Sequence, residues 1–320
     1  MQCPSLITNS LNQYFKIFLY LIVLICFGYF LSANIHSLDK LVELSITYIL
    51  VIAFTSLLSM LTLAVTFRLS ISILGLDLKF SEWFGLTALN NFYNYFLPLS
   101  GGLAIRGRFL KKNYNFEYSK YIAFISNMYF VNLLISAGIG LFLSCFLYLK
   151  NGALGILPYL FIFSGILISL ILAGLFIKYN NRSILPSKLE KYIKKFRSAN
   201  SEMWNKKFLL VISMLYLIRI ILMTLRLYFT FRAVGIDVEF IALLLVSCLI
   251  QFTGLFSLTP GNIGLREIIV SLNSSLLNVD FNTIMNISIV ERIIIMVTTF
   301  IIGFIFIVYY RVVLKTKIIS

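Results

Sequence analysis

Nine charged or amide side chains in apolar stretches of this sequence have the chemistry to bind a polar group. They are Arg106, Arg219, Arg226, Arg266, Glu267, Glu291, Arg292, Asn90 and Asn94. A guanidinium forms bidentate hydrogen bonds with a phosphate, a carboxylate pairs with a cation or accepts a proton, and an amide both donates and accepts. Ionisable groups are costly in hydrocarbon, so their presence there marks a binding or transport pathway. We take these nine residues as candidate substrate-binding residues.

The composition places these residues in a membrane protein. Of 320 residues, 60% are hydrophobic and 12% are charged, whereas a soluble domain is about half apolar and about a quarter charged. This excludes a soluble globular chain and a disordered one. The net charge of +15 favours anionic lipid headgroups at the cytoplasmic face as partners, and not nucleic acid. The four cysteines and the single histidine form no metal-binding spacing, so we expect no metal and no cofactor.

Six apolar stretches have the length of about 20 residues that a helix needs to cross the hydrocarbon core. The predicted spans are residues 14–34, 43–68, 119–148, 154–177, 208–234 and 284–310.

Two further apolar segments, residues 84–110 and 240–278, are interrupted by helix-breaking residues. In each, a proline is followed four residues later by a glycine, and then by Arg106 or Arg266. Irregular backbone at membrane depth is tolerated only where protein or a wet cavity satisfies it. We therefore predict two re-entrant helical hairpins. Their breaks are Pro98, Gly101 and Gly102 in the first segment, and Pro260, Gly261 and Gly264 in the second.

The distribution of Lys and Arg predicts the orientation in the membrane. Residues 178–207 form a basic segment, which short-loop charge statistics place in the cytoplasm together with both termini. The order of membrane crossings in residues 1–150 then recurs in residues 151–320 with the opposite orientation. We predict an all-α integral protein of the cell membrane, with residues 1–320 forming one polytopic helical bundle whose two re-entrant hairpins make an inverted repeat, as in many transporters.

Arg219 lies twelve residues beyond Lys207, which places it about 18 Å into the bilayer. Arg226 follows seven residues later and so lies on nearly the same helical face. Such a pair can pass a phosphate from one guanidinium to the next. The alternative is that these arginines form internal ion pairs with Glu267 or Glu291.

The charged pairs at 266–267 and 291–292 are expected to form one polar cluster. Its arginines suit a headgroup phosphate and its glutamates suit a cationic headgroup or a coupling proton, while a purely structural quartet is the alternative. Asn90 and Asn94 share a helical face, where amides either bind a substrate or join helices.

The two breaks resemble a known family. Residues 260–267, Pro-Gly-Asn-Ile-Gly-Leu-Arg-Glu, are similar to the Pro-Gly-x-x-Gly-x-x-Glu element of the lysylphosphatidylglycerol synthase transmembrane region family, and residues 97–102 with Arg106 resemble its first half. This family includes the flippase half of the multiple peptide resistance factor. The resemblance implies a helical bundle with re-entrant helices that moves polar-headgroup lipids between leaflets. Leu103 and Ala104 stand where the family pattern has an acidic residue.

Our leading hypothesis is a lipid translocase without enzymatic activity. The lipid is either aminoacylated and phospholipid-like or linked to a polyprenyl phosphate, and its tail stays in the bilayer. One alternative is an accessory or scaffold subunit that works with envelope glycan or lipid biosynthesis proteins. A further alternative is a membrane-embedded transferase with Glu267 or Glu291 as the base. The sequence does not indicate an oligomeric state.

Overall fold

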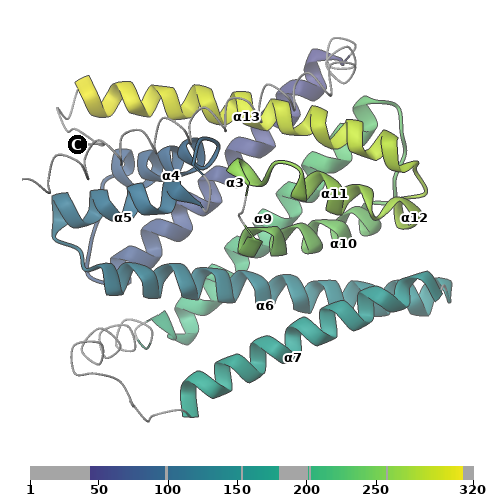
Figure 1. Cartoon of the computed structure of the whole chain (residues 1–320), viewed down its shortest axis with the longest axis horizontal. Helices are drawn as coiled ribbons and strands as arrows, with labels where there is room; N and C mark the ends of the chain where they lie inside the picture. Colours follow the sequence, from purple (N-terminus) through teal and green to yellow (C-terminus); the bar gives the residue numbers. More distant parts are fainter. Residues whose placement is uncertain are drawn as a thin grey trace, which may run out of the picture.

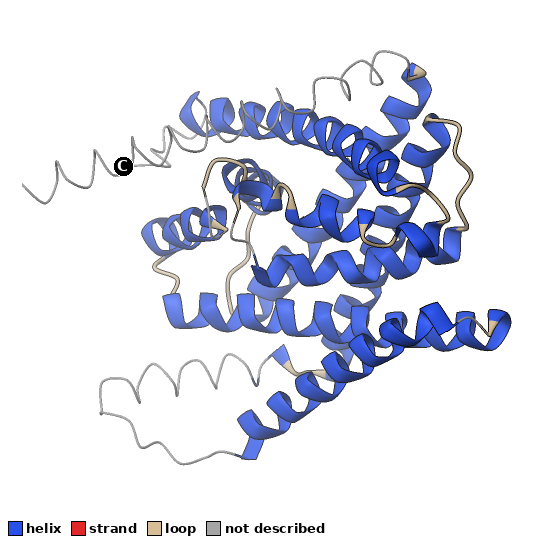
Figure 2. Ribbon diagram, turned by 45° about the vertical axis from the view of Figure 1, so that its right-hand side comes forward, coloured by secondary structure: helices blue, strands red, loops and turns tan. Residues whose placement is uncertain are grey.

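A computed structural model describes most of the chain, and every regular element in the described part is helical (Figure 2). The described residues are 44–97, 100–152, 154–179, 201, 203–256 and 259–312. The predicted span at 14–34, the break residue Pro98 and residues 180–200 of the predicted basic segment lie outside them. The all-α class is confirmed.

Four long apolar helices have the length and composition to cross a membrane. They are α3 (Ile46–Ile73), α6 (Tyr118–Asn151), α9 (Lys206–Ala233) and α13 (Phe281–Val312). A further apolar helix, α7 (Leu157–Tyr179), follows the short helix η1 (Leu154–Ile156). These helices coincide with five of the predicted spans, so the protein is an integral membrane protein.

The two interrupted segments fold as pairs of short helices. The first contains α4 (Phe80–Asn94) and α5 (Gly101–Tyr114). The second contains α10 (Phe240–Gln251), η2 (Phe252–Phe256), η3 (Pro260–Asn262), α11 (Leu265–Ser271) and α12 (Ser274–Leu277). The predicted helix breaks are therefore present. At 15 and 12 residues, α4 and α10 are about 22 Å and 18 Å long, and each is shorter than the roughly 30 Å of a hydrocarbon core.

The short helices lie between two long ones. In Figure 1, α13 runs along one side of the molecule and α6 along the other, with α4 and α5 toward one end of α13 and α10 to α12 toward the other. Helix α13 packs against both α4 and α11, α10 packs against α6, and α3 packs against α9. Both broken segments thus pack against α6 and α13.

Glycines bring α4 and α13 close together. A Cβ atom on Gly85 would lie 2.6 Å from the ring of Phe306, and one on Gly303 would lie 2.6 Å from Phe92. Small residues at a helix interface let the backbones approach within a membrane, where packing drives association. The interface is completed by stacking of Phe96 on Phe300, at 5.3 Å between ring centroids.

The same turn follows α3 and α9. Gly75 and Gly235 both adopt left-handed φ angles, of 88° and 79°, and the next residue donates its N–H to the carbonyl five residues earlier. This is a Schellman motif, which needs glycine at the left-handed position. The sequences Gly-Leu-Asp-Leu-Lys-Phe (75–80) and Gly-Ile-Asp-Val-Glu-Phe (235–240) then lead into α4 and α10. Each short-helix segment is therefore entered through an equivalent connection.

The first break is closed by a side-chain hydrogen bond. Ser100 has a left-handed φ of 54°, and the N–H of Gly102 donates to Oδ1 of Asn94 at 2.9 Å. A Cβ atom on Gly102 would overlap the backbone oxygen of Asn90. The close approach of α4 and α5 thus depends on glycine at position 102.

We predict that Gly102→Ala separates α4 from α5 and lowers the thermal unfolding midpoint in detergent, measured by circular dichroism. The matched control is Gly138→Ala, because position 138 is helical and a Cβ atom there meets nothing within 4 Å. This control should be neutral or stabilising, since alanine favours a helix over glycine by about 1 kcal/mol. Equal midpoints for the two variants would contradict the prediction.

Candidate functional site

Two adjoining hollows between the helices share an arginine lining. Their volumes are ≈ 260 Å³ and ≈ 330 Å³, and both are lined by Arg219, Arg226 and Arg292. The larger hollow is also lined by Arg106 and Arg266. We call the two hollows together the arginine cavity. Among the described residues, every charged side chain that lines it is an arginine.

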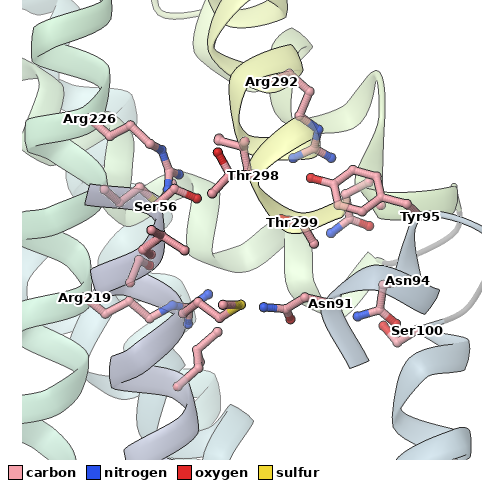
Figure 3. A pocket seen from close by; sticks show the side chains of 18 of the residues that line it. Ser56, Asn91, Asn94, Tyr95, Ser100, Arg219, Arg226, Arg292, Thr298 and Thr299 are labelled. Atoms are coloured by element: carbon pink, nitrogen blue, oxygen red, sulfur yellow. The ribbon is translucent and has the colours of Figure 1, made fainter. Parts of the chain in front are cut away.

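Side chains from three helices converge on this space (Figure 3). Arg219 and Arg226 extend from α9, two turns apart, and Arg292 extends from α13. Asn91 extends from α4 on the opposite side, so that its amide faces the guanidinium of Arg219. We call the arginines of the cavity lining the cationic wall and its amide side chains the amide wall.

Glu291 binds two of the arginines. Its Oε1 accepts from Nε of Arg226 at 2.6 Å, and its two carboxylate oxygens accept from Nη2 of Arg266 at 2.8 and 2.7 Å. The Glu291 side chain is 1% exposed. These bonds join α9, α11 and α13, and they supply the internal ion pair that was the alternative interpretation of Arg226.

Glu267 and Arg292 form a looser pair. Oε2 of Glu267 accepts from the N–H of Gly264 at 2.8 Å, which caps α11, while Oε1 lies 3.6 Å from Nε of Arg292. That separation is too long for a hydrogen bond. Nε and Nη2 of Arg292 are buried without a hydrogen-bond partner in the described structure, and its guanidinium lies 5.4 Å from the ring centroid of Tyr95. Arg292 thus retains donors for another group.

Arg219 and Arg106 have no carboxylate partner among the described residues. Arg219 makes no hydrogen bond or ion pair there, and its side chain lines both hollows. Arg106 donates from Nε to the hydroxyl of Tyr121 at 3.0 Å and lies 4.4 Å from the ring centroid of Phe67. Aromatic faces stabilise a cation without neutralising it. Both side chains therefore leave the cavity positively charged.

Amides form much of the remaining polar lining. Nδ2 of Asn90 donates to Asn91 at 3.4 Å, and Nδ2 of Asn132 donates to Gln251 at 3.4 Å. The Oδ1 atoms of Asn90 and Asn132 are buried without a hydrogen-bond partner in the described structure. Oδ1 of Asn94, in contrast, already accepts a hydrogen bond from the N–H of Gly102. The free oxygens are buried acceptors of two side chains that line the larger hollow.

The two helix breaks meet at the cavity. Gly261, with a left-handed φ of 60°, lies against Tyr95, the residue that ends α4, and a Cβ atom on Gly261 would lie 2.6 Å from the Tyr95 ring. Both residues line the smaller hollow. The site is therefore bounded by both broken segments.

The structure brings most of the predicted residues to one place. Those that line the cavity are Arg106, Arg219, Arg226, Arg266, Arg292, Asn90, Asn94 and Gly261. Those that lie behind it or shape the breaks are Glu267, Glu291, Gly101, Gly102, Pro260 and Gly264. Lining residues that the sequence did not single out include Tyr95, Ser100, Tyr129, Asn132, Gln251 and Asn262. Asn132 and Gln251 had a usable signal, since each is an amide inside an apolar helix.

Long apolar helices packed around a buried, arginine-lined cavity define a polytopic α-helical membrane protein with an internal polar site. The model of the lysylphosphatidylglycerol synthase TM region family matches residues 15–303, and the chain belongs to this family. The membership confirms the resemblance found in the sequence and relates the protein to lipid modification or transport. A comparison with curated proteins found no match.

We predict that Glu291→Gln destabilises the protein by about 3 kcal/mol, because it leaves two buried guanidinium groups without a counter-ion. Arg292→Gln should cost less, since two of its nitrogens bind no partner in the described structure. Unfolding midpoints in detergent, compared between the two variants, test this order. If Arg292→Gln lowered the unfolding midpoint more than Glu291→Gln does, Glu291 would not be the main ionic link between the helices.

Proposed function

We propose that this protein moves a polar-headgroup lipid between the two leaflets of the cell membrane. The single observation that carries the proposal is the arginine cavity, which lies where the two broken segments meet. Guanidinium groups at such a place bind a phosphate in bidentate fashion and replace its hydration shell. Two hollows of ≈ 260 and ≈ 330 Å³ hold a headgroup, while the lipid tails remain in the bilayer.

In this proposal, the α4–α5 and α10–α11 pairs are re-entrant hairpins of an inverted repeat. Three features support it. The helices α4 and α10 are too short to cross. The same Schellman turn precedes both pairs. Each pair is followed by a long apolar helix, α6 or α13. Two such halves let one site face either side of the membrane in turn, as in other transporters with broken helices.

The proposed orientation has both termini in the cytoplasm. It rests on the excess of Lys and Arg in the segment between α7 and α9 and at the end of α5, where Lys111 and Lys112 lie in the last turn. These basic residues would then bind anionic headgroups of the inner leaflet, which we propose as the main partners of this face.

The hydrogen bonding of Glu267 and Glu291 favours a transport role without covalent chemistry over a transferase role. Both oxygens of Glu291 accept hydrogen bonds from arginine, which stabilises the charged form and makes it a poor base. Glu267 lies behind Arg292 and caps α11. We therefore assign these carboxylates to holding the arginines in position.

We propose that the arginines with unused hydrogen-bond donors bind the moving headgroup and that the arginines bound to Glu291 hold the framework. Arg219 and Arg292 carry the free donors, whereas Arg226 and Arg266 are bound to Glu291. A phosphate that passes from Arg219 to Arg292 stays within reach of Arg226, which lines the same hollow. The headgroup thus exchanges one guanidinium for another without being left unpaired.

We predict that Arg219→Gln slows lipid translocation about tenfold or more, because it removes a charge-assisted bond to the phosphate without breaking an internal ion pair. The measurement uses proteoliposomes with fluorescent lipids of several headgroup classes in one leaflet, and follows their appearance in the other. The matched control is Lys150→Gln, which removes a positive charge at an exposed position in the last turn of α6.

The native protein and the control should exchange at least one lipid class faster than empty liposomes do. Exchange at the rate of empty liposomes for all classes would contradict the proposal and favour the accessory-subunit alternative, in which the arginine and glutamate bonds are only structural.

A further inference from the structure

The charges around the arginine cavity do not balance. Five arginines line it, and among the described residues only Glu267 and Glu291 pair with them, which leaves a surplus of three positive charges. Arginine remains protonated in proteins, so the surplus cannot be removed by titration. A buried surplus of this size is costly without counter-ions. The cavity is therefore complementary to a negatively charged group.

The free donors reach the cavity from two different helices. Arg219 extends from α9 and Arg292 from α13, on the side of Tyr95, and both side chains line the same hollow (Figure 3). No lysine lines either hollow in the described part of the chain. Planar guanidinium groups match a phosphate better than an ammonium does, because they bind two oxygens at once. The cationic wall is thus suited to phosphate.

The amide wall is suited to hydroxyl groups. Oδ1 of Asn90 and of Asn132 are buried acceptors without a partner, and Gln251 and Asn91 lie beside them. An acceptor of this kind needs a donor that fills the hollow. Both a hydroxyl and an ammonium could donate, but the surplus of positive charge repels the ammonium. A neutral, hydroxyl-bearing group can donate to the amide oxygens and is not repelled by the arginines.

From these two walls we infer the class of headgroup, an inference that rests on the proposed function. We propose that the arginine cavity binds a net-negative phosphate ester whose other part is uncharged and rich in hydroxyl groups, as in a lipid-linked sugar phosphate. The phosphate lies on Arg219 and Arg292, and the sugar lies on Asn90 and Asn132. An aminoacylated headgroup is excluded, because its ammonium groups add to the charge surplus.

Direct binding to the full chain in detergent tests this inference without any transport assay. Dissociation constants are measured by calorimetry for farnesyl phosphate, its glucosyl phosphodiester and lysylphosphatidylglycerol. Because each charge-assisted bond contributes about tenfold in affinity, farnesyl phosphate should bind at least tenfold more tightly than lysylphosphatidylglycerol. The double variant R219Q/R292Q should lose this difference, and its binding should depend less steeply on salt than that of the native protein.

The amide wall is tested by comparing the glucosyl diester with farnesyl phosphate. The native protein should prefer the diester, and Asn132→Leu should abolish that preference while leaving the affinity for farnesyl phosphate within about twofold. Glucose 1-phosphate distinguishes the source of the anion: it should bind more weakly than the farnesyl diester, because it lacks the tail.

Three outcomes would overturn the inference: lysylphosphatidylglycerol binding as tightly as farnesyl phosphate, unchanged phosphate binding in R219Q/R292Q, or no preference for the glucosyl diester. If glucose 1-phosphate bound as tightly as the farnesyl diester, the ligand would be a soluble sugar phosphate and not a lipid. If the anionic lipids bind as expected but no lipid crosses between leaflets in liposomes, the proposed function fails and the assignment of the headgroup class stands.

Discussion

The carboxylate of Glu291, held between Arg226 and Arg266, is the interaction on which the rest of the site depends. It joins α9, α11 and α13 at a depth where neither charge has access to bulk water. A buried ion pair adds little net stability compared with apolar packing, but it fixes geometry, because breaking it leaves an unpaired charge. The backbone of the second broken segment is thereby held against two long helices, and the cavity keeps its shape.

The remaining arginines are stabilised in a different way. Arg106 lies among the rings of Phe67, Tyr121 and Phe124, and Arg292 lies over Tyr95, so aromatic faces take the place of carboxylates. Rings attract a cation but leave its hydrogen-bond donors free. The protein thus retains several guanidinium groups at membrane depth and keeps their binding capacity for an anion.

Much of this arrangement could be predicted from the sequence, because charged residues and Pro-Gly breaks are rare in apolar segments. That rarity identified the arginines, the glutamates and both helix breaks. It could not predict which arginine is paired: Arg226 and Arg219 lie on one face, yet only Arg226 reaches Glu291, and this depends on how α13 packs against α9. Tyr95 was missed because a tyrosine after a helix is unremarkable until Gly261 is seen against it. The equivalent turns at Gly75 and Gly235 do carry a sequence signal, because both begin the pattern Gly-x-Asp-x-x-Phe.

The way in which the two breaks touch each other has a mechanical consequence. Polar bonds hold each unit internally, with Asn94 and Gly102 fastening α4 to α5, and Glu291 fastening α11 to its neighbours. Between the units, the contact of Tyr95 with Gly261 is an aromatic ring on a bare backbone, without a hydrogen bond between the two residues. Packing of this kind is less directional than a hydrogen bond. A displacement along this contact would break no polar bond between Tyr95 and Gly261, and the contact lies beside the guanidinium of Arg292.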